Sequence, residues 1–518
     1  MPVSSSTEPH ILHTAKGVGF LTSGGLVGHV VRFATAVLLA RALGADGMGM
    51  YALGLTAAGL CSALSALGFD DAMVRYLAIQ RRRGDEAAVT GTVQIGIGVP
   101  TFVALLSGVG LLVMAEPVAT GIFDEPDLVP VLRAFGCIVP FMALTNALVG
   151  AARGFKRMDI QALSLEVVQT LVRLVLISAL WFVGLEPVAA AVVFGIGDVA
   201  ASATMIALLR KATPLRDVFR PGARREVRAL VHFAFPLWLA GALRKFRQNI
   251  ETLLLGSLTA VASVGVFTVA SKVNFIGHSV YQAIITSVKP HLAELHGIQD
   301  RQGLGHLYRT TTRWTLLFGM PFFLVIVIHA EPILQVFGST FTVGTTALVI
   351  LASGELVNAA TGVCGSVLDM TRRTGAKLVN AVLWLVLTIG LNLLLIPRWG
   401  VVGAATASVV AIAVVNVLRV LQVWVLERVQ PYDRTFLKPV AAGLGAFVLG
   451  QALVNLWPAD NLVTVAVHSL ALVATYGGLV LLLGMPAEDR LVAQRVLGRV
   501  RHLVAAGVRS VRPARSPG

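Results

Sequence analysis

Long apolar segments alternate with short polar connections from one end of the chain to the other. About 20 consecutive apolar residues are enough for an α-helix to cross the hydrocarbon core of a bilayer. Such segments are predicted at 18–43, 48–78, 87–114, 129–151, 161–184, 188–209, 232–256, 262–289, 309–330, 344–367, 377–396, 401–427, 438–457 and 462–485. The pattern predicts an all-α polytopic membrane protein with about 14 transmembrane helices.

Positive charge is divided unevenly between alternate connections. One set is rich in cations, which include Arg81, Arg82, Arg83, Arg153, Lys156, Arg157, Arg372, Arg373, Arg428 and Arg434. The other set is acidic, with Glu116, Asp124, Glu125, Asp127 and Glu331. Cytoplasmic loops of membrane proteins carry an excess of Lys and Arg. We therefore expect the first set of connections and both chain termini to be cytoplasmic.

Composition supports a membrane protein and excludes one other class. The 518 residues are 56% hydrophobic and 13% charged, against about 25% charged residues in a soluble domain. A formal net charge of +15 is compatible with a nucleic-acid-binding protein. Here, however, the cations are spread over the predicted cytoplasmic loops, so we expect no nucleic-acid partner. The first apolar stretch, after Lys16, is too long for a signal peptide and is predicted to be a true span.

The chain contains an internal repeat. "LLARALGADGMGMYAL" ends the first helical hairpin of one half, and "LLLGSLTAVASVGVFTV" occupies the same place in the other, so that Gly49 corresponds to Gly265. Later, "NALVGAARGFKRMD" corresponds to "NAATGVCGSVLDMT", which pairs Asn146 with Asn358. Six predicted helices separate the two copies, so both begin on the same side of the membrane. Parallel repeats about an axis along the membrane normal are typical of secondary transporters.

The repeat and the loop lengths predict a domain organisation. We expect an N-terminal lobe at 1–209, a basic cytoplasmic linker at 210–231, a C-terminal lobe at 232–427, two further helices at 438–485 and a basic tail at 486–518. In the tail, Val and Leu recur at helical spacing and Arg fills other positions, which favours an amphipathic helix on the anionic leaflet. A partly disordered basic tail is the alternative.

Three stretches carry a family resemblance. "LLARALGADGMGMYALGLTAAGLCSALSALGFDDAMVRYLA" (38–78), "LNLLLIPRWGVVGAATASVV" (391–410) and "RQNIETLLLG" (247–256) resemble polysaccharide-biosynthesis flippases of the Wzx type, although that family usually has Asp at the position of Glu251. These flippases belong to the multidrug/oligosaccharidyl-lipid/polysaccharide exporter superfamily. The resemblance implies two pseudo-symmetric six-helix lobes plus two C-terminal helices. It also implies alternating access in the bacterial cytoplasmic membrane, with no enzymatic activity.

The same resemblance implies a substrate and partners. The substrate would be an undecaprenyl-pyrophosphate-linked oligosaccharide, such as an O-antigen or exopolysaccharide repeat unit. A polymerase and glycosyltransferases of the same pathway would be partners, together with membrane lipids. Three alternatives stay open. They are a lipid II flippase, a drug or cation antiporter of the same superfamily, and a polysaccharide polymerase or ligase. The short predicted outer loops disfavour the polymerase or ligase.

Several cations lie inside the predicted helices, where charge is costly and marks a functional pathway by default. Arg suits a diphosphate through its planar fork of donors. The headgroup candidates are Arg32, Arg247, Arg244, Arg173 and Lys272. The repeat matches Arg32 with Arg247, and Arg244 shares a helix face with Arg247. The alternative for each cation is a structural ion pair, for example Arg173 with Asp198.

The energy for transport is expected from an ion gradient, the membrane potential or downstream consumption of the product, and a buried carboxylate is the natural proton carrier. The chain has no G-x-x-x-x-G-K-[ST] motif, so no P-loop ATPase and no cofactor are expected. The candidate proton carriers, in order, are Glu251, Asp198, Glu166 and Glu355; a static ion pair is the alternative for each. His278 is interpreted as a hydrogen-bonding contact between helices. Intramembrane Asn residues, including Asn358 and Asn416, are interpreted either as sugar contacts or as helix-to-helix hydrogen bonds.

Overall fold

A computed structural model describes residues 8–212, 227–371, 374–458 and 461–484. Every element within these ranges is helical, and the described residues contain no strand. The tail predicted at 486–518 lies outside the described residues, as do positions 213–226 of the predicted linker. The question of an amphipathic helix in the tail therefore stays a prediction.

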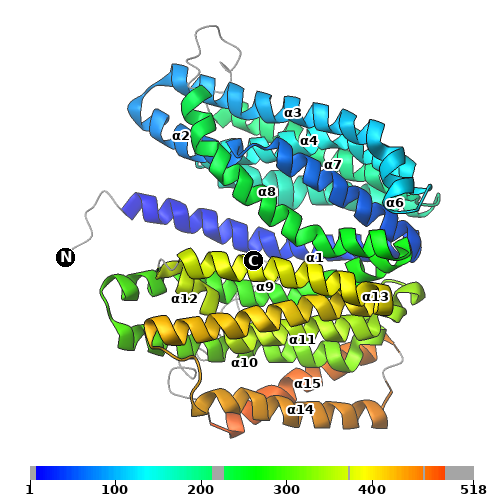
Figure 1. The fold of residues 1–518 in the computed structure, drawn as a ribbon, viewed down its shortest axis with the longest axis vertical. Coiled ribbons are helices and arrows are strands. Elements are labelled where there is room, and N and C mark those ends of the chain that lie inside the picture. The colour runs from blue at the N-terminus through cyan, green and yellow to red at the C-terminus, as the bar shows by residue number, and fades with distance from the viewer. Residues whose placement is uncertain (1–7, 213–226, 372–373, 459–460, 485–518) are drawn as a thin grey trace, which may run out of the picture. The chain divides into compact units, whose positions relative to one another are not determined.

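The helices follow the apolar segments closely (Figure 1). The first part of the chain forms α1 (Glu8–Ser65), α2 (Phe69–Arg83), α3 (Glu86–Gly121), α4 (Leu128–Gly154), α5 (Met158–Ala162), the π-helical turn η1 (Leu163–Gln169), α6 (Thr170–Trp181) and α7 (Pro187–Ala212). The rest forms α8 (Val227–Leu258), α9 (Val261–Gly297), α10 (Arg301–Gln335), the 3₁₀ turn η3 (Ser339–Gly344), α11 (Thr345–Thr361), α12 (Cys364–Met370), α13 (Thr374–Glu427), the 3₁₀ turn η4 (Arg434–Phe436), α14 (Leu437–Leu456) and α15 (Leu462–Leu482).

Ten helical segments of the described chain are long and apolar enough to cross a membrane. Two of them, in α1 and α13, contain a break at Gly44 (φ 65°) and at Gly400 (φ 53°). Glycine adopts positive φ without a steric penalty, so each break separates two helices of one hairpin. α8 and α9 have 32 and 37 residues but carry charged side chains along their length. Every segment predicted from hydropathy therefore falls on a helix.

Three predicted segments differ in detail from the structure, and one of them is 344–367, where α11 ends at Thr361 and α12 begins at Cys364. The segment predicted at 48–78 is interrupted, because α1 ends at Ser65 and α2 begins at Phe69. Leu67 (φ 47°) and Gly68 (φ 73°) both adopt left-handed backbone between them. An added Cβ on Gly68 would meet the carbonyl oxygen of Ala234 in α8, so the break lets the two backbones approach. The segment predicted at 161–184 begins with η1 instead of a regular α-helix.

The chain packs as two compact units, each described here by itself. The first comprises Met1–Val273, Ile333–Leu351 and Trp384–Ala411, and the second comprises Asn274–Pro332, Ala352–Leu383 and Ile412–Gly518. These units follow packing rather than chain order. They do not test the predicted lobe boundaries at 1–209 and 232–427, which stay a prediction.

In the first unit, α1 and the start of α9 cross at two glycines. An added Cβ on Gly49 would collide with the carbonyl oxygen of Val261, and one on Gly265 would collide with that of Ala45. Only glycine allows backbones to approach so closely. The repeat relates Gly49 to Gly265, and by the same offset it relates Ala45 to Val261. The crossing is therefore self-complementary: each copy of the repeat presents the same surface to the other.

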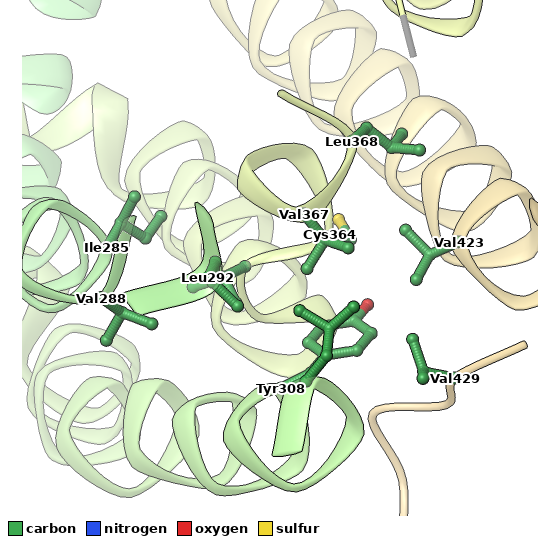
Figure 2. Packing of buried hydrophobic residues seen from close by; sticks show 11 residues of the cluster. Ile285, Val288, Leu292, Tyr308, Cys364, Val367, Leu368, Val423 and Val429 are labelled. Carbon is green, nitrogen blue, oxygen red and sulfur yellow. The ribbon is translucent and has the colours of Figure 1, made fainter. Parts of the chain in front are cut away.

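The second unit has its own apolar core (Figure 2). Ile285, Val288 and Leu292 from α9 pack with Tyr308 from α10, with Cys364, Val367 and Leu368 from α12, and with Val423 from α13. A second cluster packs α14 and α15 against α10 and α11, and includes Met320, Ala359, Ala446, Leu472 and Tyr476. The last two helices are thus held to this unit by apolar side chains.

Candidate functional site

The first candidate cation, Arg32 on α1, is paired with Glu166. The Arg32 Nη2 atom lies 2.7 Å from the Glu166 Oε2 atom, and 44% of the Arg32 side chain is exposed. One helical turn before Arg32, an added Cβ on Gly28 would lie 2.7 Å from the same carboxylate oxygen. Gly28 therefore makes room for the Glu166 carboxylate on the Arg32 face of α1. The pair leaves the guanidinium accessible.

Arg173 forms a more buried pair with Asp198. Its Nη2 atom lies 3.0 Å from the Asp198 Oδ2 atom, and only 20% and 7% of the two side chains are exposed. The same nitrogen donates to the carbonyl of Phe194 at 3.2 Å, and the guanidinium carbon lies 3.7 Å from the centre of the Phe194 ring. Gly197 leaves space for the Arg173 stem. This geometry matches the structural ion pair that the sequence allowed.

The π-helical turn η1 contributes one side chain to the Arg32–Glu166 pair and one to the surroundings of the Arg173–Asp198 pair. Glu166 within it pairs with Arg32, and Gln169 donates to the Asp198 Oδ1 atom at 3.0 Å. The Thr170 hydroxyl donates to the carbonyl of Leu165, five residues earlier, at 3.0 Å. A π-turn inserts one extra residue into a helix and often occurs at functional sites. In this chain the extra residue lets both side chains reach partners on other helices.

Helix α8 carries the second set of cations. The guanidinium carbon of Arg247 lies 4.8 Å from the centre of the Trp384 ring, a cation–π distance. Arg244, three residues earlier, is exposed. The stem of Lys245 rests against Gly59 of α1, since an added Cβ there would lie 3.4 Å from the Lys245 Cε atom. Arg244 and Arg247 thus share a face of α8 and keep accessible guanidinium groups.

The remaining two candidates of the first unit have sparse polar surroundings. Glu251 on α8 accepts a hydrogen bond from the Ser408 hydroxyl at 3.3 Å. It also lies close enough to Arg247, one turn earlier, to interact with it electrostatically. Lys272 on α9 is half-buried and forms no ion pair with any described residue. A charged side chain inside a membrane-spanning helix is by default a functional candidate, and Lys272 stays one.

Glu355, the last predicted carboxylate, belongs to a polar chain in the second unit. His278 of α9 lies with its Nδ1 atom 3.2 and 3.1 Å from the two carboxylate oxygens. The Asn358 amide donates to Glu355 at 3.3 Å, and Asn416 donates to Asn358 at 2.7 Å. Arg419 in turn donates to Asn416 at 3.1 Å. A pocket next to Glu355 is also lined by Asn274, Tyr281 and Phe322, among other side chains.

The sequence did not single out this chain of side chains, although its spacing was visible. His278 and Gln282, Glu355 and Asn358, and Asn416 and Arg419 are each three or four residues apart, which places both members on one helix face. The interpretation of His278 as a hydrogen-bonding contact between helices agrees with the structure. Its partner Glu355 could not be predicted from spacing, because α9 and α11 are distant in the chain.

The predicted residues that share contacts or a helix form three groups. The turn η1 joins Arg32, Glu166, Arg173 and Asp198; α8 carries Arg244, Arg247 and Glu251; and Glu355 lies in the second unit. A headgroup role for Arg32 and Arg247 stays a prediction.

Ten helical segments of the described chain that can span a bilayer, with charges held inside some of them, define a multi-pass membrane protein. The family model described as polysaccharide biosynthesis protein matches residues 14–296, more than half of the chain. The chain belongs to this family. A second family model, described as MatE, matches residues 236–394.

Two curated relatives show how far the similarity extends. Stage V sporulation protein B of Bacillus subtilis is 22% identical over 519 residues, which cover 94% of this chain and 98% of that protein. The probable low-salt glycan biosynthesis flippase Agl15 of Haloferax volcanii is 26% identical over 174 residues. That second match covers 33% of this chain and only 37% of the relative's length.

Two solved structures share the fold. The lipid II flippase MurJ in an inward closed conformation has a TM-score of 0.70 at 13% identity, covering 89% of this chain and 97% of that one. An inward-facing multidrug resistance MATE family transporter of the MOP superfamily has a TM-score of 0.64 at 15% identity, covering 77% and 94%. This likeness confirms the predicted fold class, and the Haloferax relative and both structural neighbours are named as flippases or transporters rather than as enzymes.

Proposed function

We propose that the protein is a flippase for an undecaprenyl-pyrophosphate-linked oligosaccharide, such as an O-antigen or exopolysaccharide repeat unit. It moves this lipid across the bacterial cytoplasmic membrane by alternating access, with both termini in the cytoplasm. Membership of the polysaccharide biosynthesis protein family supports the substrate class, as does the flippase name of the Haloferax relative. The excess of Lys and Arg in alternate connections supports the orientation.

The observation that carries this proposal is a set of accessible guanidinium groups on apolar helices. Arg32 is 44% exposed although it is paired, and Arg244 and Arg247 are exposed on α8. A diphosphate offers oxygens that accept charge-assisted bonds from Arg in place of a carboxylate. Glu166 keeps Arg32 neutralised until the headgroup replaces it. Arg173 is occupied by Asp198 and Phe194, so its role is to hold helices together. Lys272 remains a headgroup candidate.

Transport is coupled to an ion gradient through groups inside the membrane. Of the four predicted carboxylates, Asp198 and Glu166 each already have a guanidinium partner. Such a partner stabilises the ionised form and opposes proton uptake. Glu251 and the surroundings of Glu355 are the sites left for coupling. Upstream glycosyltransferases that build the oligosaccharide, and a polymerase that uses it, complete the proposed pathway.

Two other transported substrates have specific support. The best-covered structural neighbour reported above is named as a lipid II flippase, and lipid II carries the same diphosphate. The MatE match over residues 236–394 favours a drug or cation antiporter. Cations along α1 and α8 disfavour a cationic substrate, because like charges repel in a medium of low dielectric constant.

The test is a crossing assay in liposomes. Fluorescent undecaprenyl-diphosphate oligosaccharide is placed in both leaflets, and a membrane-impermeant reagent reports how much reaches the outside. We expect crossing by the wild type and at least a ten-fold loss in Arg32→Ala and in Arg247→Ala, because each removes donors to the diphosphate. Arg133→Ala is the matched control, since Arg133 is an exposed residue of α4 with a weak ion pair at 3.7 Å.

Each other result points to one alternative. Faster crossing of lipid II than of the oligosaccharide lipid would assign the protein to lipid II. Efflux of a cationic dye without lipid crossing would assign it to the antiporters. Full crossing by both Arg variants would remove the headgroup role from Arg32 and Arg247.

A further inference from the structure

The polar chain around Glu355 has a direction. Arg419 donates to the Asn416 carbonyl oxygen, Asn416 donates through its amide nitrogen to Asn358, and Asn358 donates to Glu355. Every hydrogen along these three bonds points toward the carboxylate, and a cation stands at the far end. Hydrogen bonds to the ionised form of a carboxyl group favour that form. Successive bonds in a chain also polarise one another in the same sense.

His278 completes the set of donors to Glu355. Its Nε2 atom lies 3.1 Å from the Gln282 amide nitrogen, which is a donor. In this arrangement Nε2 accepts, so the ring hydrogen of neutral His278 is on Nδ1 and is donated to Glu355. Glu355 therefore receives donors from Asn358 and His278 at once. Protonation of Glu355 would weaken both bonds, because a neutral carboxyl group is a poorer acceptor than a carboxylate.

Gln282 can serve both charge states of His278. When a proton is added to Nε2, that nitrogen changes from acceptor to donor. A half-turn of the Gln282 amide replaces its nitrogen by its oxygen, which then accepts the new hydrogen. The Nδ1–H bond to Glu355 is kept and becomes a bond between opposite charges. No helix has to move for the imidazole to gain or lose its proton.

Few other charges face this group. From α9 the nearest titratable group is Tyr281, whose ring centre lies 6.0 Å from that of His278 and whose hydroxyl donates to the Gly362 carbonyl at 2.9 Å. From α11 it is Glu355 itself; Cys364 of α12 and Arg419 of α13 interact electrostatically with Tyr281. From α10 the pocket is lined by Gly319, Phe322, Phe323 and Ile326, none of which titrates.

A route for the proton starts beside the partner of His278. The pocket is lined by Glu355, which His278 contacts, and by Asn274 and Tyr281 among others, and 30% of the His278 side chain is itself exposed. An open space beside a polar group admits water, which can deliver a proton to the exposed part of the ring and remove it again. The carboxylate is then a fixed counter-charge, and the imidazole is the group that changes.

We propose that His278, with Glu355 as its fixed counter-charge, is the group that takes up and releases the proton driving transport. The proposal rests on the proposed function for its transport step, but not for its proton-binding step. It reverses the role predicted for Glu355 from the sequence, where the carboxylate was a carrier. It also assigns energy coupling to side chains other than the cations of α1 and α8.

Two measurements test the proposal on purified full-length protein in lipid nanodiscs and liposomes. Nuclear magnetic resonance of ¹⁵N-histidine-labelled protein follows each ring through a pH titration. We expect the titration curve of one ring to be absent in His278→Gln, which assigns that curve to His278. In Glu355→Gln the midpoint of the same curve should move about one pH unit or more toward acid, because an opposite charge is lost. In liposomes, His278→Gln should lose the dependence of lipid crossing on a pH gradient.

Two exposed residues of the same helix, α9, provide matched controls. His291→Gln removes another imidazole and Glu294→Gln another carboxylate, and neither should alter the titration of His278 or the gradient dependence. Glu251→Gln tests the competing carboxylate and should keep the gradient dependence.

Other results overturn the proposal. A Glu355 carboxyl band that appears in infrared spectra over the pH range of transport, while His278 does not titrate, would make Glu355 the carrier. Loss of gradient dependence in Glu251→Gln with none in His278→Gln would place coupling on α8. If the wild type moves no lipid at all, the proposed function fails, and the resonance titration still decides whether His278 binds the proton.

Discussion

At the scale of single residues, the charges inside the helices fall into two kinds. Arg173 is largely buried, and its guanidinium contacts Asp198 through an N–H group and the ring and carbonyl of Phe194. Arg32 is similarly paired, but almost half of it stays exposed. A buried ion pair holds helices in place, while an accessible one can exchange its carboxylate for a ligand. Burial therefore separates these two roles, and burial cannot be known from residue type or spacing.

The buried pair should matter for stability. Arg173→Gln would leave Asp198 as an uncompensated charge between α6 and α7. Removing one partner of a buried pair costs about 3–5 kcal/mol. Denaturant titration in mixed micelles would measure this loss in the free energy of unfolding. Arg133→Gln, which breaks the exposed pair with Glu116, should cost no more than about 1 kcal/mol. Equal losses in the two variants would contradict the structural role of Arg173.

The stability contributed by Asp433, which precedes the turn η4 and α14, depends on pH. Burial raises the pKa of this carboxyl, but hydrogen bonds from the Thr435 hydroxyl and the Phe436 amide, together with the Arg313 guanidinium, outweigh burial and lower the pKa below its ordinary value. The contribution is therefore complete above the unfolded pKa of about 4, and it is lost as the pH falls through the folded pKa.

Replacing Asp433, which caps the turn η4, tests this contribution. Asp433→Ala should lower the free energy of unfolding by about 1 kcal/mol at neutral pH, because the Phe436 amide loses its acceptor. The variant and the wild type should converge only as the pH falls through the folded pKa of Asp433, which lies below its ordinary value of about 4. Unfolding curves at a series of pH values would show this, and a constant difference at every pH would argue against the carboxylate as the cause.

At the scale of elements, hydropathy predicts nearly every helix but not every interruption. The breaks at Gly44 and Gly400 fall in the predicted connections at 44–47 and 397–400, whereas the break between Ser65 and Phe69 lies inside the segment predicted at 48–78. The turn η1 is harder still, because a π-turn has no residue preference that separates it from an α-helix. The sequence indicates only that Glu166 and Gln169 are polar and that each needs a polar or charged partner. Those partners are on distant helices, and only the packed structure identifies them.

Deleting one residue tests the importance of η1. Removal of Val167 should restore regular α-helical spacing and rotate Glu166 by about 100° relative to Gln169 and α6. Only one of the two partners, Arg32 or Asp198, could then be reached. A double-mutant cycle between Arg32 and Glu166 would measure the coupling, which should fall to zero if the α6 side keeps its place. An unchanged coupling together with an intact Gln169 bond would show that the extra residue is dispensable.

At the scale of the whole molecule, the class of protein could be predicted because a bilayer imposes one rule on the whole chain. Backbone groups in hydrocarbon must be satisfied within a helix, so apolar runs of sufficient length become helices. The chemistry of the site does not follow from such a rule. His278 and Glu355 are 77 residues apart, and their meeting depends on how α9 packs against α11.

The internal repeat leads to a prediction about the intact protein. If the chain is cut between α7 and α8, the two parts should still assemble when they are expressed together. The crossing of α1 with α9 at Gly49 and Gly265 lies between them. Co-purification through a tag on one part would report assembly. Gly49→Leu and Gly265→Leu should each abolish it, because the side chain would meet backbone, whereas Gly98→Leu meets open space and should not.

The symmetry of that crossing also bears on how such a chain can arise. Gly49 contacts Val261 in the same way that Gly265 contacts Ala45, which is the form of contact found across a two-fold axis between identical subunits. A single copy of the repeat would therefore already carry a surface that fits a second copy of itself. Fusion of two such copies would need no new interface, and each could afterwards acquire its own charges: Arg32 in one, and Arg247 in the other.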